Sequence, residues 1–195
     1  ITANLKNIKK SPKLLSQKDF RSMKMQGNEM VEALYSDLEQ VQQLNVTIGK
    51  QRIGQTALDF FSDIIPKIDL VWVIAPESKS ELERFYIASK QKLWIGSDLQ
   101  AIRLASNKLE TKKYLKSLSI NTPDEITFES LKKKNYTEAV YKPIDGAGTT
   151  DTYKIENKKN IISTLNKKSS CFFLEEWVEG TAYSVSLNCK LSGFD

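Results

Sequence analysis

The chain has 195 residues, of which 40% are hydrophobic and 27% are charged, a composition typical of a soluble globular protein. It carries 29 basic and 24 acidic residues, so its formal net charge is +5, and it contains no histidine. This sequence therefore excludes a histidine general base, a His-assisted nucleophile and a His-containing zinc site. Its chemistry must rest on Lys, Asp, Glu and bound metal.

The basic excess consists almost entirely of lysine, whereas proteins that read DNA depend on arginine forks. We therefore expect a solvated lysine surface and no nucleic-acid partner. The longest apolar runs, such as Leu70–Ala75, are far shorter than the roughly 20 residues that span a bilayer, and no signal-peptide pattern opens the chain. We expect a cytoplasmic protein with no membrane association, in which Cys171 and Cys189 are reduced thiols in core strands.

The first predicted elements alternate between helix and strand. Apolar residues recur at helical spacing between Gly27 and Val41, and Val46-Thr-Ile48 is typical of a short strand. A second short helix is predicted from Ala57 to Ile65, where Pro66 stops it.

The alternation continues with a near-continuous apolar run, Asp69–Ala75, which predicts a central parallel strand buried on both faces. Ser78 and Glu81 have capping-box spacing for a helix that runs to about Lys90, and Lys92–Gly96 predicts the next strand. This order predicts an α/β fold in residues 1–98, with an open parallel sheet, flanking helices, and ligands at the carboxyl ends of the strands.

The pattern changes after Asp98 to two helical segments and then to strand pairs. The expected helices are Leu99–Leu104 and Lys108–Leu118, and the strands lie around Tyr141, Tyr153, Phe172 and Val185. We therefore predict a second, α+β domain in residues 99–195. Because Ile1–Asn4 provides at most the end of an opening strand and the sequence stops just after a strand, we expect a fragment that lacks both ends of a larger protein.

A lysine followed by a glycine-rich loop is the most informative local feature. Pro143 favours extended backbone at Lys142, and Val140 and Tyr141 favour a strand. The loop that follows lets backbone amides approach an anion closely and consists of Asp145, Gly146, Ala147, Gly148, Thr149 and Thr150. Since a second strand follows, there is no helix N-terminus to hold a pyrophosphate, which argues against a Walker A loop and a dinucleotide fingerprint.

Three motifs in register resemble the ATP-grasp superfamily over roughly residues 69 to 190. They are Ser106-Asn-Lys108 at the start of a helix, Val140-Tyr-Lys-Pro143 with its glycine loop, and Phe172-Phe-Leu-Glu-Glu-Trp-Val-Glu-Gly-Thr-Ala-Tyr-Ser-Val185. Within that superfamily the chain resembles the tyramine-glutamate ligase group of pterin and furan cofactor biosynthesis, judged from residues 27–38, 74–77 and 180–186. The resemblance implies that residues 1–98 are a pre-ATP-grasp domain and that 99–195 are an ATP-grasp domain incomplete at its C-terminus.

The resemblance also implies a role for each site residue. Lys108 and Lys142 would hold ATP phosphates under the loop 145–150. The adenine segment would be Glu175, Glu176, Trp177 and Val178, with the Glu175 carboxylate accepting from the adenine amino group. Many ATP-grasp enzymes have an acidic ribose ligand where Ala182 stands, so we move that role to Glu179. The family's magnesium ligands would lie beyond Asp195, so the metal, Mg²⁺, has no predicted ligand here.

Glu77 has two open interpretations: a helix N-terminal carboxylate, or a residue that contacts substrate. The resemblance implies an ATP-dependent carboxylate-amine ligase that acts on small molecules through an acyl phosphate, although this fragment alone is expected to be inactive. The alternative is a non-catalytic ATP-binding module with a sensing or regulatory role. The sequence identifies neither the acid, nor the amine, nor the oligomeric state.

Overall fold

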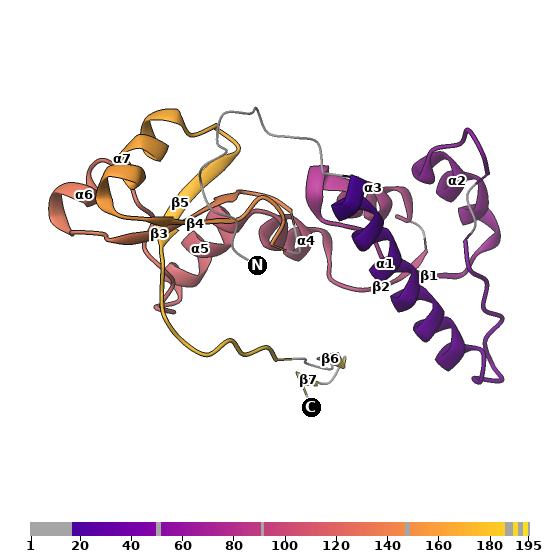
Figure 1. Cartoon of the computed structure of the whole chain (residues 1–195). Helices are drawn as coiled ribbons and strands as arrows, with labels where there is room; N and C mark the ends of the chain where they lie inside the picture. Colours follow the sequence, from indigo (N-terminus) through magenta and orange to yellow (C-terminus); the bar gives the residue numbers. More distant parts are fainter. Residues whose placement is uncertain are drawn as a thin grey trace.

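The computed structural model describes residues 17–49, 52–90, 92–146, 149–185, 189–190 and 193–194. Figure 1 shows a helix-rich N-terminal unit and a unit built on an antiparallel sheet, joined through α4. The strand end expected at residues 1–4 and the loop residues Ala147 and Gly148 lie outside the described residues.

The N-terminal unit pairs two short strands in parallel. Its elements are α1 (Gln17–Leu38), α2 (Ala57–Ile64), the 3-10 turn η2 (Ile65–Lys67), β1 (Leu70–Trp72), the 3-10 turn η3 (Ser78–Ser80), α3 (Glu81–Ala88) and β2 (Leu93–Ile95). Strands β1 and β2 pair from Leu70↔Leu93 to Trp72↔Ile95. Phe61, Val71 and Phe85 form the buried core, with the Phe61 and Phe85 rings edge to face at 5.1 Å. The predicted order of helix and strand is confirmed from α2 to β2.

Two N-terminal predictions are wrong in detail. The structure has no strand at residues 46–48, which are irregular, and α1 begins ten residues before the predicted start. The apolar spacing missed the first turns of α1, because exposed helical residues need no apolar stripe; Met25, for example, is 58% exposed.

Strand β1 is not buried on both faces. Val71 is buried, but the side chains on either side are exposed, Leu70 at 42% and Trp72 at 47%. Alternating burial is typical of a strand covered on one face, and α2 and α3 provide that cover through the core around Val71. Trp72, despite its size, does not anchor the core.

The predicted capping box does not form. Ser78 lies in η3, and the residue that caps α3 is Ser80, whose φ of 56° is left-handed and whose side chain makes no cap hydrogen bond. An N-cap hydroxyl reaches the first turn from extended backbone, which this turn does not adopt.

The prediction that Cys171 is buried in a strand is also wrong. Cys171 is exposed and lies in the turn before β5 (Phe172–Glu176), and the side chain of Cys189 lies outside the described residues.

The second unit places three antiparallel strands in the order β4-β3-β5 within the described residues. Its elements are α4 (Leu99–Ser106), α5 (Lys108–Ser117), α6 (Ser130–Lys133), β3 (Glu138–Pro143), β4 (Tyr153–Glu156), α7 (Lys158–Lys167), β5, β6 (Cys189–Lys190) and β7 (Gly193–Phe194). One sheet face carries Ile155 and Leu174, which are fully buried against Ile161 of α7. The strand–loop–strand prediction is thereby confirmed, whereas residue 185, expected in a strand, is irregular.

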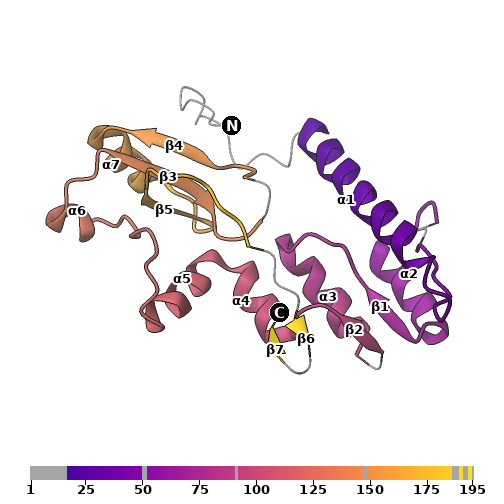
Figure 2. The ribbon, with the colours of Figure 1, turned by 90° about the horizontal axis from the view of Figure 1, so that it is seen from below.

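The other face, the polar sheet face, carries Lys142, Lys154 and Glu175 together with the buried Phe173. It lies on the side of α5 (Figures 1 and 2). Because side chains alternate along a strand, Lys142 and Val140 of β3 share this face, and the pairing sets Lys154 and Glu175 opposite Val140. The molecule is thus a mixed α/β protein with a parallel pair, flanking helices and an antiparallel sheet, as predicted. Among the described residues, no helix has the combination of length and apolarity that crossing a membrane requires.

Candidate functional site

A buried carboxylate between two lysines forms the centre of the site. Glu175 of β5 is 6% exposed, and its Oε2 lies 2.6 Å from Nζ of Lys112 on α5. Its other oxygen, Oε1, pairs with Nζ of Lys142 on β3. Both ammonium groups lie 5.4 Å from the centre of the buried Phe173 ring, within reach of a cation–π interaction. A charged group this deeply buried requires such partners, so the three side chains form one unit.

Lys108 lies at the start of α5 because Asn107 caps that helix. The Asn107 side chain accepts hydrogen bonds from the backbone N–H groups of Leu109 and Glu110, at 3.0 and 3.1 Å. Nζ of Lys108 donates to the carbonyl oxygens of Asp145 and Gly146, at 2.9 and 2.6 Å. The lysine therefore binds the first residues of the glycine loop.

The pKa of Lys108 is lowered from its ordinary value. Burial of the ammonium group is the largest cause, and the positive charge of Lys142 is the second. Asp145, Glu77 and Glu175 act in the opposite direction, since their negative charges favour the protonated lysine. An anion bound near both lysines would relieve the repulsion between these two cations.

The loop after β3 has left-handed backbone at several positions. Gly146 has φ = 89°, which a residue without a Cβ adopts at little cost, and Thr149 and Asp151 have φ of 57° and 54°. Tyr153 donates from its hydroxyl to Oδ1 of Asp151 at 3.1 Å. The half-buried Thr150 lies between Thr149 and Asp151. Lys108 binds the loop at its start and Tyr153 binds it just after its end, so both ends of the loop are held by contacts within the chain.

Glu77 lies beside the same loop. It lines a pocket of about 220 Å³ that also includes Lys79, Ser106, Asn107 and Asp145. The backbone N–H of Lys79 donates to Oδ2 of Asp145 at 3.1 Å, which links the turn after β1 to the loop after β3. The structure therefore places Glu77 of the N-terminal unit near the first residue of the glycine loop.

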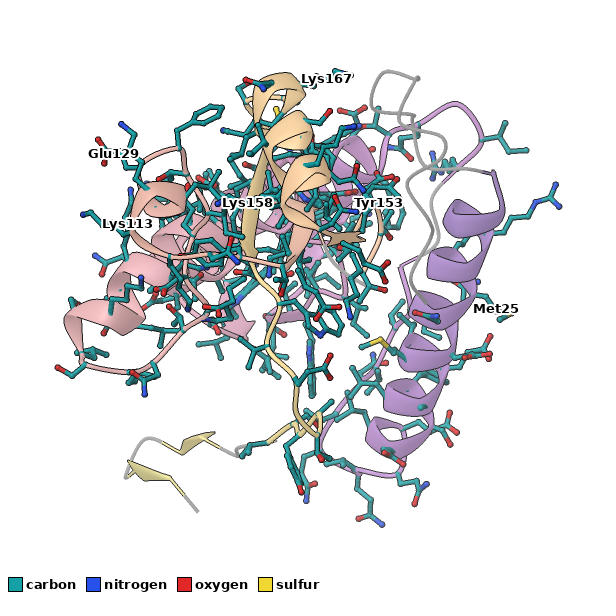
Figure 3. All side chains as sticks on the ribbon, turned by 60° about the vertical axis from the view of Figure 1, so that its left-hand side comes forward. Met25, Lys113, Glu129, Tyr153, Lys158 and Lys167 are labelled. Atoms are coloured by element: carbon teal, nitrogen blue, oxygen red, sulfur yellow. The ribbon has the colours of Figure 1, made fainter. Side chains whose placement is uncertain are left out.

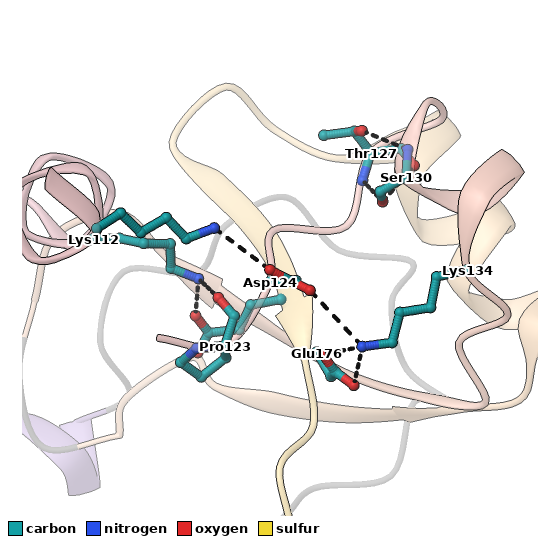
Figure 4. A network of polar contacts seen from close by, with 9 residues as sticks. Lys112, Pro123, Asp124, Thr127, Ser130, Lys134 and Glu176 are labelled. Carbon is teal, nitrogen blue, oxygen red and sulfur yellow. Dashed lines mark hydrogen bonds and ion pairs between the residues drawn. The ribbon is translucent and has the colours of Figure 1, made fainter. Parts of the chain in front are cut away.

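The segment predicted to bind adenine divides between two faces. Glu176 points away from Glu175 and accepts from Lys134 Nζ with both carboxylate oxygens at 2.8 Å (Figure 4). Its backbone N–H donates to the backbone carbonyl oxygen of Asp124. Hydrogen bonding to Glu176 is the largest cause of the raised pKa of Lys134. This ion pair lies on the sheet face that carries Ile155 and Leu174 and does not contribute to the lysine site.

Trp177, Val178 and Glu179 extend beyond β5 and form a second cluster. Lys154 Nζ lies 4.3 Å from the centre of the Trp177 ring, and the indole N–H donates to the Glu179 carboxylate. Lys154 also pairs with Glu138 at 2.7 Å, and that hydrogen bond is the main cause of its raised pKa. Val178 is 61% exposed. These side chains offer an aromatic surface with polar neighbours next to the polar sheet face.

The structure thus brings five predicted residues into one electrostatic neighbourhood around Lys108: Glu77, Lys108, Lys142, Asp145 and Glu175. Trp177 to Glu179 lie at the second cluster, and Glu176 lies on the opposite face. Sequence reasoning missed Lys112. A signal was present, because Lys112 is four residues after Lys108 and therefore shares its helix face.

The acidic side chains of the site are the candidate ligands for Mg²⁺. Among the described residues, no group of three or more His, Cys, Asp or Glu side chains that could hold a metal ion comes together. The most buried carboxylate of the site, Glu175, already pairs with two lysines. We assign no Mg²⁺ ligand among the described residues.

Two protein families match the chain in consecutive segments. Residues 37–102 match the pre ATP-grasp 3 domain, and residues 105–195 match the ATP-grasp domain. The two matches identify ATP-grasp superfamily domains in this chain, as the three motifs predicted.

The particular proteins that resemble the chain are ligases. The D-alanine–D-alanine ligase of Aquifex aeolicus (strain VF5) is 35% identical over 102 residues, which cover 48% of this chain and 35% of that relative. Similar solved structures include the D-alanine–D-alanine ligase of Bacillus anthracis, with 22% identity, a TM-score of 0.48 and coverage of 62% of this chain and 44% of that one. The VanG D-Ala:D-Ser ligase of Enterococcus faecalis has 16% identity, a TM-score of 0.47 and coverage of 58% and 37%. The narrower resemblance to tyramine-glutamate ligases stays a prediction.

Proposed function

We propose that this chain is the nucleotide-binding part of an ATP-dependent carboxylate-amine ligase. The observation that carries the proposal is the convergence of Lys108 and Lys142 beside the glycine loop, with the pKa of Lys108 lowered by burial and by the charge of Lys142. An ATP-grasp domain match over residues 105–195 and the ligase relative support the same function.

In this proposal the two lysines and the loop bind the phosphates of ATP. A triphosphate carries about four negative charges, and two ammonium groups in a partly desolvated site neutralise much of that charge. Loop residues 145–150 would supply backbone N–H groups and cover the phosphates. A covered site also keeps water away from a reactive intermediate.

The adenine end would lie along residues 175–178. Since the Glu175 carboxylate pairs with two lysines, we assign adenine recognition to main-chain groups of this segment and to the Trp177 ring. Glu179 is the candidate acceptor for the ribose hydroxyls. Lys154, beside Trp177 and Glu179, would limit how these side chains turn.

The reaction would proceed in two steps on small-molecule substrates. An oxygen of the acid attacks the γ-phosphorus, ADP leaves, and an acyl phosphate forms; the amine then attacks the acyl carbon and releases phosphate. Lys108 and Lys142 would stabilise the charge that develops on the transferred group, and Mg²⁺, when bound with ATP, would add charge neutralisation. Glu77, in the pocket beside the loop, is the candidate contact for the acid or the amine.

The substrates and the biological role are further parts of the proposal. The relative's name points to amino-acid substrates, and the tyramine-glutamate ligase resemblance points to glutamate and an aromatic amine in pterin or furan cofactor biosynthesis. A cytoplasmic location and the lack of a nucleic-acid partner remain predictions of the composition.

Calorimetric titration with ATP and Mg²⁺ tests the nucleotide site. We expect binding by the parent protein and a loss of roughly tenfold or more in affinity for Lys142→Met, because a charged hydrogen bond contributes about 1.5–3 kcal/mol. Lys113→Met is the matched control, since Lys113 is an exposed lysine of the same protein that pairs only with Glu110 among the described contacts. Equal affinity in parent and Lys142→Met would place the phosphates elsewhere.

Product analysis separates the ligase from the non-catalytic alternative. ADP formation that requires both an acid and an amine, with amide detected by mass spectrometry, supports the ligase. ATP binding without turnover over a panel of amino acids and amines, in the protein at its full length, would favour an ATP-sensing module instead.

A further inference from the structure

Lys112 differs from the other lysines of the site in how firmly it is held. Its side chain is 9% exposed, and its Nζ donates to Glu175 Oε2 at 2.6 Å and to the carbonyl oxygen of Pro123 at 2.7 Å. Figure 4 shows the bond from Lys112 to Pro123, which precedes the segment that pairs with the outer edge of β5. Lys112 is thus fixed between α5 and the loop that follows it.

Lys142 is held less firmly. Its side chain is 22% exposed, and the ion pair that the structure gives it is the one with Oε1 of Glu175. A four-carbon stem and partial exposure allow its ammonium group to turn from this carboxylate toward a ligand at the loop.

The energy of that movement depends on what remains at Glu175. Removing the last cation from a buried carboxylate is strongly destabilising, whereas Glu175 would keep a partner, Lys112, at 2.6 Å. Because Lys112 contacts Oε2 and Lys142 contacts Oε1, departure of Lys142 leaves Glu175 paired.

We propose that Lys112 is a positioning residue that holds Glu175 in place, so that Lys142 can exchange the Glu175 carboxylate for a nucleotide phosphate. Lys112 itself does not contact the nucleotide. This inference rests on the proposed function, since it names the way in which the same phosphate site is prepared for ATP.

The test measures ATP·Mg²⁺ affinity by calorimetry in the parent protein, in Lys112→Met and in the double variant Lys112→Met/Glu175→Gln. Lys112→Met makes Lys142 the remaining cation at Glu175, so we expect affinity to fall roughly tenfold or more. The double variant removes the carboxylate that retains Lys142, so its affinity should return to within about threefold of the parent. Lys113→Met, the next position of α5, should bind ATP as the parent does; its side chain is exposed and points outward (Figure 3).

The rescue separates positioning from structural damage, because a general loss of folding would be as large or larger in the double variant. Unchanged affinity in Lys112→Met, or a double variant as weak as Lys112→Met, would overturn the inference. If Lys112→Met does not fold by circular dichroism, Lys112→Gln, which keeps a donor without the charge, takes its place with the same expected outcomes. Failure of the parent to bind ATP would overturn the proposed function, and with it this inference.

Discussion

The lysines of the site show how differently one residue type behaves in different surroundings. Lys112 is fixed by a carboxylate and a carbonyl oxygen, Lys108 donates to two carbonyl oxygens, and Lys142 pairs with a carboxylate while 22% of its side chain is exposed. Carbonyl oxygens carry only partial charge, so Lys108 lacks the full compensation that Lys112 has. Burial and the positive charge of Lys142 lower the pKa of its ammonium group.

The pKa of Lys108 can be followed by NMR in protein with ¹³C-labelled lysine. Since the charge of Lys142 is the second cause of the lowered value, Lys142→Met should raise the Lys108 pKa toward 10.5, the value of an unperturbed lysine. The same pKa should be unaffected by Lys113→Met. A Lys108 pKa that stays the same in Lys142→Met would show that the two charges do not interact.

The same shift predicts how stability depends on pH. Between the folded-state pKa of Lys108 and 10.5 the unfolded chain binds more protons than the folded one, so the contribution of this group to stability rises with pH across that window. Below the folded-state pKa, the charged lysine lowers stability by a constant amount. Lys108→Met should remove this part of the pH dependence, which denaturant unfolding at a series of alkaline pH values measures; an identical profile in parent and variant would contradict the assignment.

At the scale of the element, α5 orients the site. Asn107 caps its N-terminus, and the Thr111 hydroxyl donates to the carbonyl oxygens of Leu104 and Asn107 at 2.7 and 3.0 Å. These bonds fix where the helix begins, and the helical period then sets Lys108 and Lys112 on one face toward the loop and the sheet. A shift in the helix start would rotate both ammonium groups away together.

Asn107→Ala should lower the free energy of unfolding by about 1 kcal/mol, because two backbone N–H groups at the start of α5 lose their acceptor. Urea denaturation measures this change. Asn107→Asp keeps an acceptor oxygen and should retain most of the stability. Asn121→Ala, in the exposed loop after α5, is the matched control. A loss in Asn121→Ala as large as that in Asn107→Ala would mean that capping is not the cause.

At the scale of the molecule, the described chain has two hydrophobic cores that share no residue. One contains Phe61, Val71 and Phe85, and the other surrounds Ile155 and Leu174 between the sheet and α7. The hydrogen bond from Lys79 N–H to Asp145 links the two units, and the Arg103–Glu83 pair at 2.7 Å links α4 to α3. Because such polar links between the two units are few, we expect the units to open separately.

Leu174→Ala tests whether the two units open separately. Leu174 is fully buried, so the truncation should cost about 2–5 kcal/mol in the sheet unit. Hydrogen exchange should show lost protection in β3, β4 and β5 and near-parent protection in α2 and α3. Leu93→Ala, at a site 68% exposed, is the control for a leucine truncation without a cavity. Equal loss of protection in both units would show that they unfold as one.

The sequence by itself determined the features that depend on neighbouring residues. Lys142 before Pro143, the glycine loop and the strand after it are local patterns, and the structure contains that strand–loop–strand unit. The spacing of Asn107 and Lys108 at a helix start is equally local. Local patterns gave wrong predictions where solvent exposure or turn geometry determined the structure. These places are the long α1, the irregular residues 46–48, the left-handed Ser80 and the exposed Cys171.

Only the tertiary structure decided which charges meet. Lys112 and Glu175 are 63 positions apart, and nothing in either segment indicates that they pair. The strand register sends Glu175 to the lysines and Glu176 to the opposite face, and the packing of two units places Glu77 beside the loop. Buried charges are stabilised by partners brought together from distant segments, and such pairings are set by the fold as a whole rather than by the residues beside them in the chain.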